Sequence, residues 1–153
     1  MLHPPRCGSN GECCAAFIPI IEIRGFTPFL VNLKDKVNSV PDLFSYLCVG
    51  QLNDHTLTVL QAKNRVLDYH IHEKSDEMFF CIEGEFDIEF IDGIMHLCEG
   101  DFIIIPKGTS HRPICKELVK CLLIEINGTL TRENTGGTYR DAEGFHRRNE
   151  ICE

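Results

Sequence analysis

The chain has 153 residues, of which 43 % are hydrophobic and 25 % are charged, as in an ordinary globular domain. Its formal net charge is −8 with the histidines counted neutral, a sign that repels the phosphates of nucleic acids and anionic lipids. The longest uncharged stretch near the start, residues 13–21, is too short to cross a bilayer. We therefore expect neither a nucleic-acid partner nor a membrane partner.

Cysteine usage and the first residues favour a reducing compartment. The nine cysteines are odd in number, and their spacing follows no disulfide framework. Residues 1–14 contain no apolar segment of the kind that a secretory signal requires, so we expect a cytoplasmic protein. Cys7, Cys13 and Cys14 lie close together but lack a fourth ligand, which favours free thiols over a thiolate metal site.

The chain divides into two arms and a central region of short strands. Residues 1–19 mix proline, glycine and cysteine without periodicity, and residues 129–153 are polar, so both are predicted to be irregular arms. Residues 20–128 form the predicted domain. Within it, β-branched and aromatic residues predict strands at 43–49, 56–62, 66–72, 77–82, 86–90, 94–98, 101–105 and 120–126.

These segments predict an all-β fold. Residues 86–90 alternate apolar and acidic side chains, which is the pattern of a strand with one wet face. Asp92 and Gly93 then supply the turn of a hairpin. No stretch between residues 43 and 126 carries a sustained helical stripe of apolar side chains. Many short strands separated by turns are typical of an antiparallel sandwich or barrel.

Three histidines and one glutamate are the most informative residues for function. His70 and His72 are two positions apart on a predicted strand, so their side chains share a face. Glu77 opens the next predicted strand, which would run back beside the first and bring its carboxylate alongside the imidazoles. His111 follows a turn shaped by proline and glycine, and it begins a further strand on the same wall.

These residues stand within two motifs that resemble those of the cupins, a family of small antiparallel β-barrels. The first motif reads Gly-x5-His-x-His-x3,4-Glu-x6-Gly, and the second reads Gly-x5-Pro-x-Gly-x2-His-x3-Asn. The matching positions are His70, His72, Glu77, Gly84, Gly100, Pro106, Gly108 and His111. Asn64 and Cys115 depart from the first glycine and the final asparagine. Over residues 43–126 the resemblance implies a cupin-type barrel, a double-stranded β-helix or jelly roll, flanked by the two arms.

The resemblance also implies a metal site. In the family, the residues that correspond to His70, His72, Glu77 and His111 bind a divalent transition metal inside the barrel. Imidazole and carboxylate donors suit iron, manganese, nickel, zinc, cobalt or copper, and the sequence does not choose among them. The alternative is an unmetallated polar pocket, which we disfavour because burying such groups without a cation costs free energy.

Strand alternation adds candidates around this site. If the two histidines of the first motif face the lumen, so does Asp68, which could accept a proton or orient an imidazole; the alternative is a rim aspartate. Glu77 could leave the metal to act as a base. We therefore name Glu77 and Asp68 as candidate catalytic residues. By the same parity Phe79 lines the lumen, and Cys81 is interpreted as a small buried side chain rather than a reactive thiol.

Two functions fit this reading of the sequence. The first is a metal-dependent enzyme, of the dioxygenase, isomerase, lyase or decarboxylase type, that acts on a small oxygen-bearing metabolite at an open metal position. The second is a non-catalytic, metal-dependent module that binds a small molecule. Proton-transfer groups beside the metal would favour the enzyme, and a sealed apolar lumen the binding module. Small cupins often pair through their sheets, and residues 18–31 are apolar enough to dock on a neighbour, so we expect a homodimer.

Overall fold

The structure is a computed structural model, and it describes residues 30–130 and 138–143. Strands make up most of this part of the chain. The helix α1 (Leu33–Asn38) comes first, capped by the Asn32 side chain, which accepts the Asp35 N–H at 3.1 Å. The strands are β1 (Ser45–Leu52), β2 (His55–Ala62), β3 (Arg65–Val66), β4 (Glu77–Glu83), β5 (Glu85–Phe90), β6 (Gly93–Cys98), β7 (Phe102–Ile105), β8 (His111–Cys115), β9 (Val119–Ile126) and β10 (Thr138–Asp141). Among the described residues, no helix has both the length and the apolar character that a membrane crossing requires.

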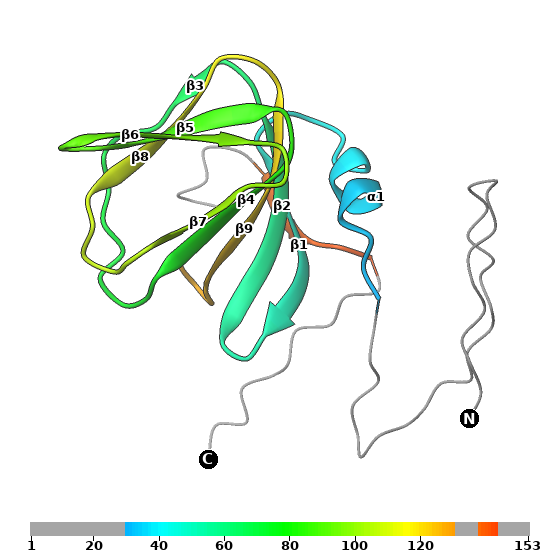
Figure 1. The fold of residues 1–153 in the computed structure, drawn as a ribbon. Coiled ribbons are helices and arrows are strands. Elements are labelled where there is room, and N and C mark those ends of the chain that lie inside the picture. Colours follow the sequence, from blue (N-terminus) through cyan, green and yellow to red (C-terminus); the bar gives the residue numbers. More distant parts are fainter. Residues whose placement is uncertain (1–29, 131–137, 144–153) are drawn as a thin grey trace, which may run out of the picture. The chain divides into compact units, whose positions relative to one another are not determined.

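The strands form two sheets that face each other (Figure 1). The larger sheet has the order β10-β1-β2-β9-β4-β7, and the smaller has the order β3-β8-β5-β6. The strand pairs are antiparallel, apart from the parallel pair of β1 and β10. This jelly-roll arrangement confirms the predicted all-β fold class.

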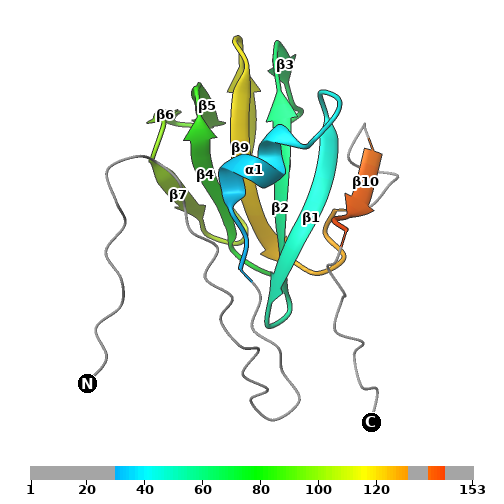
Figure 2. The same cartoon turned by 90° about the vertical axis from the view of Figure 1, so that its right-hand side faces the viewer.

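Two apolar layers hold the sheets in place. Between the sheets, buried side chains from both pack together, among them Phe79 of β4 and Ile88 of β5. On the outer face of the larger sheet, Val37 of α1 packs against Val59 and Leu122. Figure 2 shows the helix lying across this outer face. The helix thus covers the outer face of the larger sheet, and the cavity described below is lined by residues of both sheets.

The strand predicted over residues 66–72 is wrong beyond its first residue. β3 ends at Val66, and beyond it the chain keeps only irregular contacts with β8. Leu67 donates to the Pro113 carbonyl at 3.2 Å, and His70 and His111 exchange two backbone hydrogen bonds of 3.0 and 3.1 Å. The prediction that the strand of Glu77 runs beside that of the histidines is also wrong, because β4 belongs to the larger sheet. The chain crosses from the smaller sheet to the larger one between His70 and Glu77, so the histidines and the glutamate meet across the interior.

Part of the predicted C-terminal arm, residues 129–153, takes part in the fold. β10 pairs with β1, and Ala142 is buried in the apolar layer beneath α1. A polar edge strand of this length has no periodic apolar pattern by which the sequence could reveal it. The predicted N-terminal arm, residues 1–19, lies outside the described residues, so the domain limits 20–128 remain a prediction.

Gly84 of the first motif is held where no side chain fits. Its φ is +89°, and a Cβ atom there would lie 2.5 Å from the backbone oxygen of Leu118. Gly100 has a similar φ of +92°, with nothing within 4 Å of an added Cβ. We expect Gly100→Ala to lower the free energy of unfolding by about 1–2 kcal/mol, through backbone strain alone, and Gly84→Ala by about 3 kcal/mol or more. Urea denaturation measures both, and equal losses would contradict the close approach at Gly84.

Candidate metal centre

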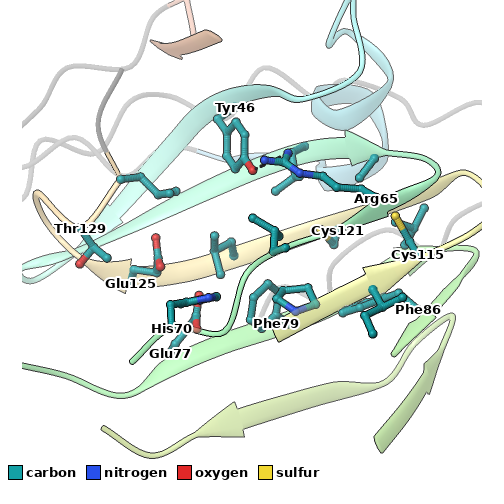
Figure 3. A pocket seen from close by; sticks show the side chains of 18 of the residues that line it. Tyr46, Arg65, His70, Glu77, Phe79, Phe86, Cys115, Cys121, Glu125 and Thr129 are labelled. Atoms are coloured by element: carbon teal, nitrogen blue, oxygen red, sulfur yellow. Dashed lines mark hydrogen bonds between the residues drawn. The ribbon is translucent and has the colours of Figure 1, made fainter. Parts of the chain in front are cut away.

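Four donor side chains converge at one end of the cavity between the sheets. We refer to His70, His72, Glu77 and His111 as the His/Glu cluster. Their ligand atoms all lie within 4.8 Å of one another, and the ring centres of the histidines are 4.4 to 5.7 Å apart. Figure 3 shows His70 and Glu77 side by side at this end. The structure thus brings together the four residues that the two motifs singled out, although they come from different sheets.

Backbone carbonyls orient two of the imidazoles. The Nδ1 of His70 is 2.9 Å from the Asp68 carbonyl, and the Nδ1 of His111 is 3.0 Å from the Thr109 carbonyl. A carbonyl only accepts hydrogen bonds, so each Nδ1 carries a proton. The Nε2 of each ring is then the nitrogen that can bind a metal or, when it is protonated, donate to a carboxylate. Metal-binding histidines are commonly held in this way.

Glu77 lies at the centre of the cluster. It is 3 % exposed, and its Oε2 is 2.8 Å from the Nε2 of His111 and 3.2 Å from the Nε2 of His72. Burial acts to raise the pKa of Glu77, but the hydrogen bond with His111 and the close contact with His72 outweigh it and hold the pKa below its ordinary value. Burial acts to lower the pKa of His111, and here the contact with Glu77 prevails and raises it. The carboxylate therefore attracts positive charge into a buried site.

Glu125 of β9 brings a second buried carboxyl group to the cluster. It is 4 % exposed, and its Oε1 lies 3.7 Å from the Nε2 of His72. Burial and the negative charge of Glu77 raise the pKa of Glu125 to about 10. Without a cation, Glu125 therefore stays protonated at neutral pH.

The sequence analysis missed Glu125, although the pattern of β9 contains a signal for it. Inward-facing residues alternate along this strand, and those before Glu125 are the buried Val119, Cys121 and Leu123. A charged residue at the next inward position of an apolar strand is costly to bury unless a partner compensates it. That pattern alone would have placed Glu125 among the candidates.

The donor set fits a divalent transition metal. The Nε2 of His72 and the Oε2 of Glu125 are buried and make no hydrogen bond within the described part of the chain. Unsatisfied buried polar atoms cost free energy, and a bound cation would compensate both the lone pairs and the negative charge. Three imidazoles and a carboxylate are also the donors that such metals prefer. His70, His72, His111 and Glu77 could therefore hold the metal, with Glu125 beside it.

The cluster faces a cavity of about 500 Å³. Asp68, Glu125 and Thr129 add polar groups to its lining, while aromatic and aliphatic side chains from both sheets form most of the rest of the wall. Figure 3 shows two of these, Phe79 beside Glu77 and Phe86 farther along the cavity. The volume is in the range typical of sites for small molecules.

Three other predicted residues have distinct surroundings. Asp68 is exposed at the cavity lining, and its backbone oxygen, not its carboxylate, holds His70. Its catalytic role stays a prediction. Cys81 is fully buried in the layer between the sheets, and burial raises its pKa to about 11, so the thiol stays protonated at neutral pH. Phe79 lines the cavity.

Comparisons with known proteins agree with the fold and the motifs. The sequence model of the family described as "Cupin domain" matches residues 57–127. The uncharacterized protein YdbB of Bacillus subtilis (strain 168) is 35 % identical over 82 residues, which are 53 % of this chain and 72 % of that protein. A cupin-2 domain containing protein of Shewanella frigidimarina is 30 % identical, with a TM-score of 0.61, over 64 % of this chain and 95 % of its own.

A protein of Neisseria meningitidis superposes with a TM-score of 0.58 at 25 % identity, over 65 % of this chain and all of its own. With an all-β jelly roll, both cupin motifs and these relatives, the chain belongs to the cupin superfamily. It is a cupin with a buried histidine and glutamate cluster that could bind a metal.

Proposed function

We propose that this protein is a metal-dependent enzyme that acts on a small oxygen-bearing metabolite, in a reaction of the dioxygenase, isomerase, lyase or decarboxylase type. The observation that carries the proposal is the place of the His/Glu cluster at the wall of a cavity of about 500 Å³. A divalent metal held by the cluster would polarise a ligand oxygen or, if redox-active, exchange electrons with the ligand. The proposal thus includes both the class of ligand, a small oxygen-bearing metabolite, and the binding of a divalent metal.

Carboxyl groups around the cluster support an enzyme over a binding module. Glu77 belongs to the cluster, Glu125 lies beside it, and Asp68 lines the same cavity. Glu125 would hold or release a proton at its Oε2, the oxygen that has no hydrogen-bond partner in the described residues. A module that only binds its ligand needs no such group in its cavity.

Elemental analysis followed by a reaction screen tests the proposal. The full chain is purified without chelator and without an affinity metal, in a Cys98→Ser background. That background is needed because the exposed Glu85, His96 and Cys98 also bring ligand atoms within 4.8 Å of one another and could bind metal adventitiously. We expect about one metal ion per chain.

The metal-loaded protein is then incubated with diketones, hydroxy acids and sugar acids, and proton NMR follows their conversion. We expect a conversion that requires the metal and that disappears in His111→Ala. Binding of these compounds without conversion would favour the non-catalytic module instead. A chain that takes up no metal, even after reconstitution, would overturn the proposal.

The homodimer and the absence of nucleic-acid and membrane partners stay predictions. Most of the stretch expected to dock on a neighbour, residues 18–29, lies outside the described residues. Light scattering on the eluting protein measures the mass of the assembly: twice the mass of one chain is the expected result, and the mass of a single chain would contradict it.

A further inference from the structure

A cationic side chain lies across the cavity from the His/Glu cluster. Arg65, the first residue of β3, lines the cavity and is the only lysine or arginine among the described residues of its lining. Its Nη1 donates a hydrogen bond to the hydroxyl oxygen of Tyr46 at 3.1 Å. Figure 3 shows the guanidinium and the phenol meeting on the far side of the cavity from Glu77. The sequence analysis named neither residue.

Neighbouring groups hold this pair in a defined position. Tyr46 is 5 % exposed, and the guanidinium carbon of Arg65 stands 4.6 Å from the ring centre of Phe44. Phe44 itself has a φ of +62°, a conformation that is rare for an aromatic residue, and its N–H donates to the Gln61 carbonyl at 2.8 Å. A strained backbone of this kind persists only where the surrounding structure enforces it. The guanidinium is thus supported from two sides.

The hydrogen-bonding capacity of the pair suits an anion. The Tyr46 oxygen accepts from Arg65, which leaves the hydroxyl proton to donate to a ligand. A guanidinium has five N–H donors in a planar fork that matches the two oxygens of a carboxylate. Both groups are donors, and the shape of the fork favours the planar pair of oxygens of a carboxylate.

The cavity has two chemically different groups, the Arg65–Tyr46 pair and the His/Glu cluster, and much of its remaining lining is apolar. Besides the Arg65–Tyr46 pair and the His/Glu cluster, the lining includes Leu60, Phe79 and Leu123. This apolar wall offers nothing to a polar ligand body, but it packs well against hydrocarbon or an aromatic ring.

We propose that Arg65 and Tyr46 form a carboxylate subsite, which binds the acid group of a small substrate with an apolar body while its other, oxygen-bearing end faces the His/Glu cluster. The inference rests on the proposed function for the second half of that statement. It deepens that function by naming the substrate class: apolar carboxylic acids with a separate metal-binding oxygen group.

Calorimetric titration of the full, zinc-loaded chain tests the inference, with zinc chosen because it has no redox chemistry. The probes are 3,4-dihydroxyphenylacetate and 3,4-dihydroxyphenylacetamide, which share a metal-chelating catechol and differ in the charged group. We expect the acid to bind about tenfold or more tightly than the amide, since hydrogen bonds to charged groups exceed those to neutral ones. In Arg65→Met the two affinities should agree within about threefold.

Matched variants separate the subsite from general electrostatics. Lys63→Met removes the same charge two residues away, where Lys63 pairs with Glu117 at 3.7 Å outside the cavity lining, and should keep the preference for the acid. Arg65→Lys keeps the charge without the fork, and Tyr46→Phe removes only the hydroxyl; both should show an intermediate preference. A melting temperature for each variant verifies folding.

The outcomes separate failure of this inference from failure of the proposed function. Equal binding of acid and amide by the parent protein, or an unchanged preference in Arg65→Met, overturns the subsite while metal binding stands. If the parent protein binds neither zinc nor any other divalent transition metal, the proposed function fails, and the metal-free chain is titrated with phenylacetate and phenylacetamide. A preference for the acid that depends on Arg65 then still supports the subsite, and the lack of one overturns it.

Discussion

Alanine in place of His72 or Glu77 is expected to lower the affinity for zinc on the order of a thousandfold, beyond the 10–100-fold typical of outer-shell changes. Each variant removes one of four donors whose ligand atoms lie within 4.8 Å of one another. Glu77→Ala also removes the buried negative charge that attracts the cation. Competition against a chelating dye, in the Cys98→Ser background, measures the dissociation constant.

A surface histidine provides the control for this series. His55 carries an acidic neighbour, Asp54, whose Oδ1 is 2.9 Å from its Nδ1, but it is not part of the cluster. We expect His55→Ala to leave zinc affinity within about twofold, since surface substitutions have small effects. An affinity in His72→Ala and Glu77→Ala that stays close to that of the parent protein would refute the assignment of the cluster as the metal site.

Glu125→Gln is expected to stabilise the metal-free protein at alkaline pH. The pKa of Glu125 is raised from 4.5 to about 10 in the folded chain, so between these values the folded state keeps a proton that the unfolded state has lost. The stability that this proton contributes is present at acid pH and declines as the pH rises. Between pH 5 and pH 8 we expect the parent protein to lose about 2–3 kcal/mol of unfolding free energy.

Urea denaturation in the presence of chelator, at intervals from pH 5 to pH 8, measures this loss. Glutamine has the shape of a protonated glutamate and does not titrate, so Glu125→Gln should lose much less stability over the same range. His111, whose pKa is also raised, loses its contribution in the same direction, and this remains in both proteins. Glu77 has a lowered pKa, so its contribution is lost only at acid pH, below this range. Parallel pH profiles for the two proteins would contradict the burial of a protonated Glu125.

Much of the fold could be predicted because its signals are local. Alternation over 86–90 and the turn at Asp92 and Gly93 predicted the hairpin that β5 and β6 form. Asn64, which replaces a motif glycine, has a φ of +50°, a conformation that asparagine tolerates. The same local reasoning failed beyond Val66. Residues 67–70 make only irregular hydrogen bonds with β8, and the chain then crosses to the larger sheet, which the composition of the segment does not show.

The candidate site was predicted in part for the same reason. The spacings of the two motifs predicted the four residues of the His/Glu cluster, since turn length and strand period determine which side chains share a wall. Glu125 and the pair of Arg65 and Tyr46 belong to no motif. They reach the cavity only because β9, β3 and β1 are brought around it by the packing of the two sheets.

By itself, the sequence determined the all-β class, the family resemblance and the four donors, because strand period, turn residues and motif spacing are properties of neighbours along the chain. Tertiary structure alone decided that the histidines and Glu77 meet across two sheets. It also decided that a second carboxyl group is buried beside them and that a guanidinium faces them across an apolar cavity. The physical reason is that burial, pKa shifts and cavity shape depend on which distant segments pack together, and a linear pattern does not specify those contacts.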